Sequence, residues 1–105
     1  MIESIDLIGK SKKTVDSIGQ IILEDEKTVV FADVESITQS EFMAAGQAGH
    51  KPELRFLVWR ADYNNQQYVD YNGKRYSIYR TYEAINGRIE LYAERRTGNV
   101  KESDS

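Results

Sequence analysis

Hydrophobic and polar positions alternate along most of the chain, which predicts β-strands and turns. The first strand is expected over residues 2–9, IESIDLIG, with Ile5 and Leu7 on one face. A second is expected over residues 15–25, where Gly19 would form a bulge. The basic run KSKKT, which follows the first strand, and the acidic run EDEKT, which follows the second, are interpreted as solvated turns.

Two later strands are apolar on both faces. They are expected over residues 27–38, KTVVFADVESIT, and residues 53–62, ELRFLVWRAD. Such a strand is buried on both faces or meets a partner chain. Phe31 and Trp59 are therefore candidate residues of a subunit interface, and packing of Trp59 in the core is the alternative. Val30, Ala32 and Val34 share one face of the first strand, and Leu54, Phe56 and Val58 share one face of the second.

The last third of the chain predicts a β-meander with two tight turns. Asn72-Gly73 and Asn86-Gly87 are typical of two-residue hairpin turns, which need a positive φ at both positions. The first turn would pair Val69 with Tyr76, and the second would pair Ala84 with Ile89 and Tyr82 with Leu91. One face of the resulting sheet is apolar, so this sheet should bury one side. That face would carry Val69, Tyr71, Tyr76, Ile78, Tyr82, Ala84, Ile89, Leu91 and Ala93.

The stretch TQSEFMAAGQAGHKP, residues 38–52, interrupts this β pattern and favours a long loop or a short helix. Phe42 and Met43 could plug one end of a barrel. Alternatively, the segment could be a loop that contacts other subunits or a channel, or it could be disordered. Gly46 and Gly49 would then supply hinges. We predict an all-β fold, a small antiparallel β-barrel of six to seven strands over residues 1–95, with a flexible polar tail over 96–105.

Composition and charge exclude several kinds of site. The formal net charge is −3, which disfavours a phosphate-binding surface, and the chain has no cysteine. No apolar run approaches the roughly 20 residues that span a bilayer, so a soluble cytoplasmic product is expected. The only histidine, His50, is interpreted as a solvated loop residue, and the acidic triplet 24–26 as a turn. We expect no catalytic, cofactor-binding or metal-binding residues, and no enzyme activity.

Several motifs in fixed order resemble one known family. They are ADVES at 32–36, QSEF at 39–42, Ala45-Gly46, KPE at 51–53, VWRADY at 58–63, VDYNGKRYSIYRTY at 69–82 and IELYAE at 89–94. Together these motifs resemble the head–tail adaptor proteins of tailed bacteriophages and prophages, also called head-closure or head-completion proteins. The resemblance covers about two-thirds of the chain, and the N-terminal third matches only in its strand pattern.

The resemblance implies a structural role in the virion neck, at the head–tail interface, after synthesis in the bacterial cytoplasm. Such proteins form a ring, typically dodecameric, below the portal and its connector protein, where they help to retain DNA and to dock the tail. The implied channel or gating loop contains Phe42, Met43, Gly46 and Gly49. Implied partners are further copies of the chain, the connector and a tail-terminator or tail-completion protein, with DNA passing through without tight binding. The isolated chain is expected either as a monomer or as a ring.

Two other functions compete with head closure. A tail-completion or tail-terminator protein of the same neck would share the size and the β character. A nucleic-acid-binding small barrel would use the tyrosines and arginines of the C-terminal half to stack bases. The acidic net charge disfavours this second alternative.

Overall fold

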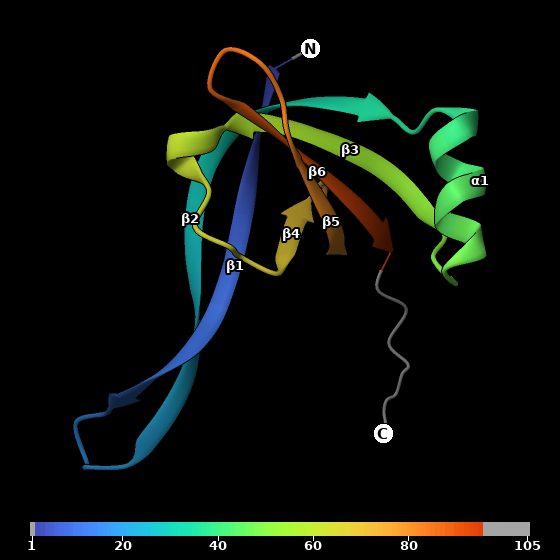
Figure 1. The fold of residues 1–105 in the computed structure, drawn as a ribbon. Coiled ribbons are helices and arrows are strands. Elements are labelled where there is room, and N and C mark those ends of the chain that lie inside the picture. Colours follow the sequence, from blue (N-terminus) through green and yellow to red (C-terminus); the bar gives the residue numbers. More distant parts are fainter. Residues whose placement is uncertain (1, 96–105) are drawn as a thin grey trace.

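Six strands and one short helix account for most of the chain in the computed structural model, which describes residues 2–95 (Figure 1). The predicted tail at 96–105 lies outside the described residues. The strands are β1 (Ile2–Val15), β2 (Ile21–Ser36), β3 (Pro52–Trp59), β4 (Tyr68–Tyr71), β5 (Lys74–Glu83) and β6 (Arg88–Arg95). Helix α1 (Gln39–Gln47) connects β2 to β3, and a single 3₁₀ turn (Arg60–Asp62) follows β3.

The strands form a closed antiparallel barrel in the order β1-β2-β3-β6-β5-β4. The ring of strands closes where Leu7 of β1 pairs with Val69 of β4. This closing ladder joins only Asp6–Ile8 to Tyr68–Asp70. The ladder between β2 and β3 is nearly as short, and it joins Asp33–Ser36 to Leu54–Leu57. The predicted fold class, a small antiparallel β-barrel, is therefore confirmed.

The barrel is filled by side chains that point inward from all six strands. Leu7, Phe56, Val58, Val69 and Leu91 have no measurable exposure. Because strand side chains alternate between faces, the inward residues follow the period of two that the sequence showed. The remaining core residues are Ile5, Val30, Ala32, Tyr63, Tyr76, Ile89 and Ala93.

β1 and β2 are much longer than expected, and together they form an arm that leaves the barrel (Figure 1). The run KSKKT belongs to β1 and the run EDEKT to β2, so the prediction of two turns there was wrong. Gly19 lies in the turn between these strands with φ +85°, not in a bulge. A register shift between Ile8 and Ser11 marks the true bulge, at the base of the arm. The arm is the hairpin formed by residues 11–25.

The meander follows the predicted turns, with one change of register. Val69 pairs with Tyr76 across the first turn, as predicted. Across the second turn Thr81 pairs with Leu91, and Tyr82 pairs with Glu90. The predicted pairing of Tyr82 with Leu91 was wrong by one residue, and Tyr82 is 56% exposed instead of buried. A second irregularity between Ile78 and Arg80 shifts the ladder by one more residue, so Ile78 pairs with Ala93 and lies two residues away from its predicted register.

Candidate functional site

Helix α1 confirms the short helix that the sequence offered as one alternative at 38–52, and local contacts explain where the helix begins and ends. The Thr38 hydroxyl oxygen accepts a hydrogen bond from the Glu41 amide at 3.2 Å, which caps the first turn. At the other end Gly49 has φ +87°, a conformation that favours glycine after a helix. Gly46 lies inside the helix. The structure thus places only Gly49, of the two predicted hinges, in a conformation that other residues rarely adopt.

Polar contacts attach α1 to the outside of the barrel. Glu41 accepts hydrogen bonds from the Tyr79 hydroxyl at 2.9 Å and from Arg80 at 2.6 Å. His50 lies 2.7 Å from Glu94 and stacks on the Tyr79 ring, with ring centres 4.5 Å apart. Burial, together with the Glu41 hydrogen bond, raises the pKa of Tyr79 well above its usual range. His50 is therefore part of this attachment and not a free loop residue.

Phe42 and Met43 point away from this attachment. Their exposed fractions are 52% and 60%, and Ala45 is the buried residue of the helix. The barrel core closes without either side chain, so the expectation that they plug the barrel is not met. A role for them in a channel or at a partner stays a prediction. Both side chains are, however, placed on the surface where such a contact would need them.

A second exposed apolar surface covers the outer face of the first three strands. We call Ile2, Val29, Phe31 and Trp59 the outer apolar surface, since their exposed fractions lie between 51% and 69%. Asp33 of β2 pairs with Leu57 of β3, and when this antiparallel register is continued by two residues, Trp59 comes next to Phe31. The Arg88 guanidinium lies 4.5 Å from the centre of the Trp59 ring. Core packing of Trp59 is therefore wrong, whereas an interface role for Phe31 and Trp59 stays a prediction.

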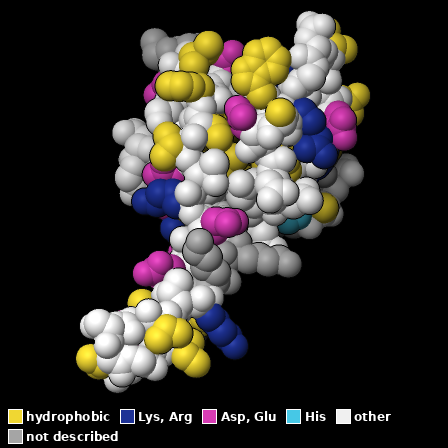
Figure 2. Space-filling model, turned by 90° about the vertical axis from the view of Figure 1, so that its left-hand side faces the viewer, with side chains coloured by type: hydrophobic (Ala, Val, Ile, Leu, Met, Phe, Trp, Pro, Cys, Tyr) yellow, Lys and Arg dark blue, Asp and Glu magenta, His cyan; other side chains and the backbone are white. Residues whose placement is uncertain are grey.

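The tip of the arm is a third apolar surface, which the sequence analysis missed. Val15, Ile18, Ile21 and Leu23 are each at least 67% exposed, and Figure 2 shows hydrophobic side chains gathered at the end of the arm. The Asp16 carboxylate accepts hydrogen bonds from the amides of Ile18 and Gln20, at 3.0 and 2.8 Å, and so holds the turn. The available signal was the run IGQIIL between polar stretches, which fits an exposed hairpin as well as a buried strand.

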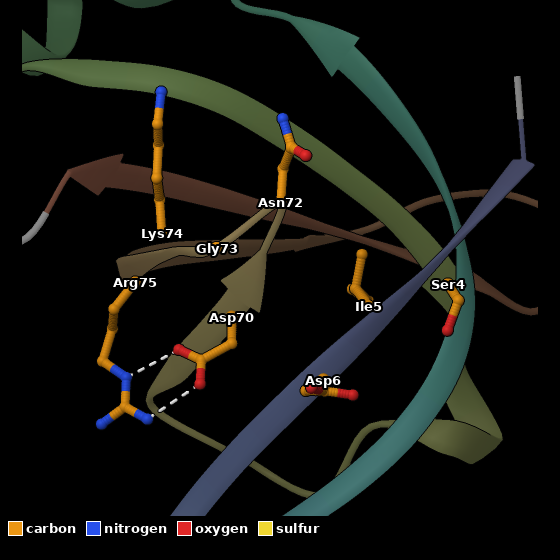
Figure 3. A pocket seen from close by; sticks show the side chains of 8 residues that line it. All are labelled: Ser4, Ile5, Asp6, Asp70, Asn72, Gly73, Lys74 and Arg75. Atoms are coloured by element: carbon orange, nitrogen blue, oxygen red, sulfur yellow. Dashed lines mark hydrogen bonds and ion pairs between the residues drawn. The ribbon is translucent and has the colours of Figure 1, made fainter.

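An ion-pair network ties the base of the arm to the barrel beside a pocket of about 530 Å³ (Figure 3). Arg75 donates two hydrogen bonds to Asp70, at 2.7 and 2.9 Å, and lies 3.6 Å from Asp25 of the arm. Lys27 lies 3.9 Å from Asp6. In Figure 3, Arg75 turns toward Asp70 while Lys74 points away from the pair. The guanidinium is thus occupied by carboxylates, and the pocket is not arranged to hold an anion.

Acid is expected to weaken this network. Hydrogen bonds from Arg75 lower the pKa of Asp70 in the folded chain. A lowered pKa stabilises the fold above the unfolded value of about 3.9, and this contribution is lost as the pH falls through the lower, folded value. The free energy of unfolding should therefore fall with pH below about 4. Urea unfolding of the wild type and of Asp70→Asn at several pH values measures this: the variant should show a shallower fall, and an equal slope in both chains would contradict the assignment.

Between residues 2 and 95, no group of three or more His, Asp or Glu side chains is placed to hold a metal ion. No helix in this range is long and apolar enough to cross a membrane. The arrangement provides three exposed apolar surfaces on a closed barrel: α1, the outer apolar surface and the arm tip.

No protein-family model matches the chain, and no curated protein matches it at a significant level.

Proposed function

We propose that the chain is a structural subunit of a tailed-phage neck, a head-closure protein that forms a homo-oligomeric ring below the connector. The observation that carries the proposal is the placement of large apolar side chains on a closed barrel. Val15, Ile18 and Ile21 project on the arm, and Phe31 and Trp59 lie on the outer face. A barrel that already has a full core gains nothing by exposing them, so such surfaces are typical of subunits that meet partners. The sequence resemblance supplies the identity of the assembly.

A ring needs two different surfaces on each subunit, because heterologous contacts close around an axis. The arm and the outer apolar surface are such a pair, since they belong to different parts of the molecule (Figures 1 and 2). Phe42 and Met43 on α1 are not used in this subunit contact. They are proposed to contact the connector above the ring, the tail-terminator or tail-completion protein below it, or the channel. The action proposed is steric and needs no cofactor or catalytic group.

DNA is proposed to pass this ring without tight binding. Five arginines of the barrel have a carboxylate within 4 Å, which reduces the positive charge available to phosphates. This pairing disfavours the alternative of a nucleic-acid-binding small barrel. The pairs are Arg55 with Glu35, Arg60 with Glu83, Arg75 with Asp70, Arg80 with Glu41 and Arg88 with Asp33.

The proposal predicts that the purified chain restores function to virion heads that lack it. Tail-less heads with packaged DNA, incubated with the protein, should bind it, retain their DNA for longer and become competent to join tails. Nuclease-accessible DNA measures retention, and electron microscopy of the product measures tail joining. Trp59→Ser combined with Phe31→Ser should reduce all three effects, because both side chains belong to the proposed subunit contact.

A matched control separates surface loss from misfolding. Ile85→Ser changes another large exposed side chain, 80% exposed at the turn between β5 and β6, and should leave head binding unchanged. Absence of binding to DNA-filled heads would refute the proposal. If the protein instead binds isolated tails and leaves DNA retention unchanged, the role is tail completion.

A further inference from the structure

The arm has two free backbone edges along almost its whole length. β1 pairs with β4 only at Asp6–Ile8, and β2 pairs with β3 only at Asp33–Ser36. Within residues 2–95, the backbone of the arm, residues 11–25, is therefore hydrogen-bonded only across its own hairpin, while the Asp25 side chain contacts Arg75 of the barrel. Unpaired strand edges present rows of N–H and C=O groups that readily accept another strand. The bulge near Gly9 turns the arm away from the barrel, which leaves both edges open (Figure 1).

The two strands of the arm carry opposite charge. The basic run KSKK, residues 10–13, belongs to β1, and the acidic run EDE, residues 24–26, belongs to β2. Within one hairpin the register already places Lys12 opposite Glu24. When two hairpins lie side by side and point the same way, β2 of one is antiparallel to β1 of the next. Each new contact then joins an acidic strand to a basic one in the antiparallel arrangement.

We propose that the arms of neighbouring copies pair edge to edge, β2 against β1, so that the ring contains a continuous antiparallel sheet of arms. The occupant of each edge is a second copy of this chain. The contact is heterologous, and it can repeat until the ring closes. This inference rests on the proposed function for the existence of the ring, and it names the contact that holds the ring together.

Pairing of the arms also accounts for their apolar side chains. Val15 lies opposite Ile21, and Lys13 lies opposite Leu23, so these residues share one face of the hairpin. In a sheet of adjacent arms the exposed faces of Val15, Ile21 and Leu23 meet their counterparts in the next copy. Side chains that the isolated chain leaves at least 67% exposed thereby form one apolar band around the ring.

Thiol cross-linking tests the predicted pairing directly, because the chain contains no cysteine. Lys13→Cys places a thiol on β1, and Leu23→Cys places one on β2. At high protein concentration, a short bismaleimide linker should give covalent dimers mainly when the two variants are mixed. Gln47→Cys, on the exposed side of α1, should give little product with either arm variant. Dimers of each variant with itself, without an excess in the mixture, or no dimers at all, would overturn the proposal.

Removal of the arm provides a second measurement. Ile8 and Lys27 are directly paired, so Asn-Gly in place of residues 9–26 would join them through a two-residue turn. The barrel core lies outside the deleted segment, so this short-arm chain should fold. Sedimentation over a range of concentrations should show assemblies of the wild type and only monomers of the short-arm chain. A wild type that stays monomeric, or a short-arm chain that assembles equally well, would refute the arm contact.

The two proposals fail in different ways. A chain that seals DNA-filled heads but shows no cross-linking between arms would retain the proposed function and lose only this contact. Arms that cross-link in a chain that never binds heads would support the contact and refute the proposed role in the neck.

Discussion

Replacement of Phe56 with alanine is expected to lower the free energy of unfolding by about 3–5 kcal/mol, the usual loss for a buried phenylalanine. Phe56 has no exposed surface and lies in the centre of the barrel. Its ring contacts Tyr71 and Tyr76 edge-on, with ring centres 5.6 and 6.0 Å apart. The truncation would remove these contacts and leave a cavity between β3 and the meander. Urea unfolding followed by circular dichroism measures the loss.

Phe42→Ala is the matched control, because it removes the same atoms from a side chain that is 52% exposed. We expect a change of less than about 1 kcal/mol there, as for most surface substitutions. Equal losses at the two positions would mean that the inside and the outside of the barrel are wrongly assigned. A small loss at Phe56 alone would mean that the core collapses around the cavity.

Replacement of Glu41 with alanine is expected to release α1 while the barrel stays folded. The Glu41 side chain is only 12% exposed, and it accepts hydrogen bonds from Tyr79 and Arg80. Loss of charged hydrogen bonds of this kind costs about 1.5–3 kcal/mol each, and the Tyr79 hydroxyl would lose its partner. Amide hydrogen exchange in α1 should accelerate by at least about tenfold, since 1.4 kcal/mol corresponds to a factor of ten.

The location of the change makes this prediction specific. Amides of β3 and β6 should keep their protection, because the barrel core does not include α1. Gln47→Ala, in the exposed last turn of the same helix, should leave exchange in α1 almost unchanged. Equal acceleration throughout the barrel would show that α1 and the barrel unfold as one unit. Unchanged exchange in α1 would show that His50 and its contact with Glu94 suffice to hold the helix.

The turns were predictable because their signals are local. Asn72 has φ +55° and Gly73 has φ +76°, as a tight hairpin of this type requires, and the predicted pairs around them are present. Asn86 and Gly87 adopt similar angles. In that hairpin, however, the Ala84 amide bonds to the Arg88 carbonyl, so one extra residue enters before the ladder begins. The register shift follows from this longer turn, which the sequence indicated only through the unfavourable pairing of Glu83 with Glu90 in the simple register.

The shift has a physical reason that depends on side chains far apart in the sequence. The predicted register would have put Glu83 opposite Glu90, whereas the observed one puts Glu83 opposite Ile89. It also frees Arg80, which would otherwise have faced the core, to bond to Glu41 of α1. The partner of Arg80 lies on a segment whose position the sequence could not supply. The second bulge, at Tyr79, was unpredictable for the same reason.

The arm and the exposed tryptophan were missed because an apolar face in the sequence does not show whether it is buried within the chain, exposed to solvent or covered by a partner. KSKKT and EDEKT look like solvated turns, but both runs lie on a paired two-stranded ribbon, and the EDEKT side chains are exposed there. The pattern around Trp59 correctly showed a strand with two apolar faces. Only the fold shows that one face of this strand lines the barrel interior, so the other face is exposed to solvent or to a partner.

The short ladder between β1 and β4 also governs how the chain reaches its fold. β1–β2, β4–β5 and β5–β6 are hairpins between neighbours in sequence, which form on the microsecond scale. The pairing of Leu7 with Val69 instead closes a loop that contains all the residues between them. This closure forms only three residue pairs, so it recovers little of the entropy that it costs. Closure is therefore expected as the late, slow event of folding. Until it occurs, the apolar lining of a half-open sheet is accessible, and a newly made chain is at its most vulnerable to aggregation.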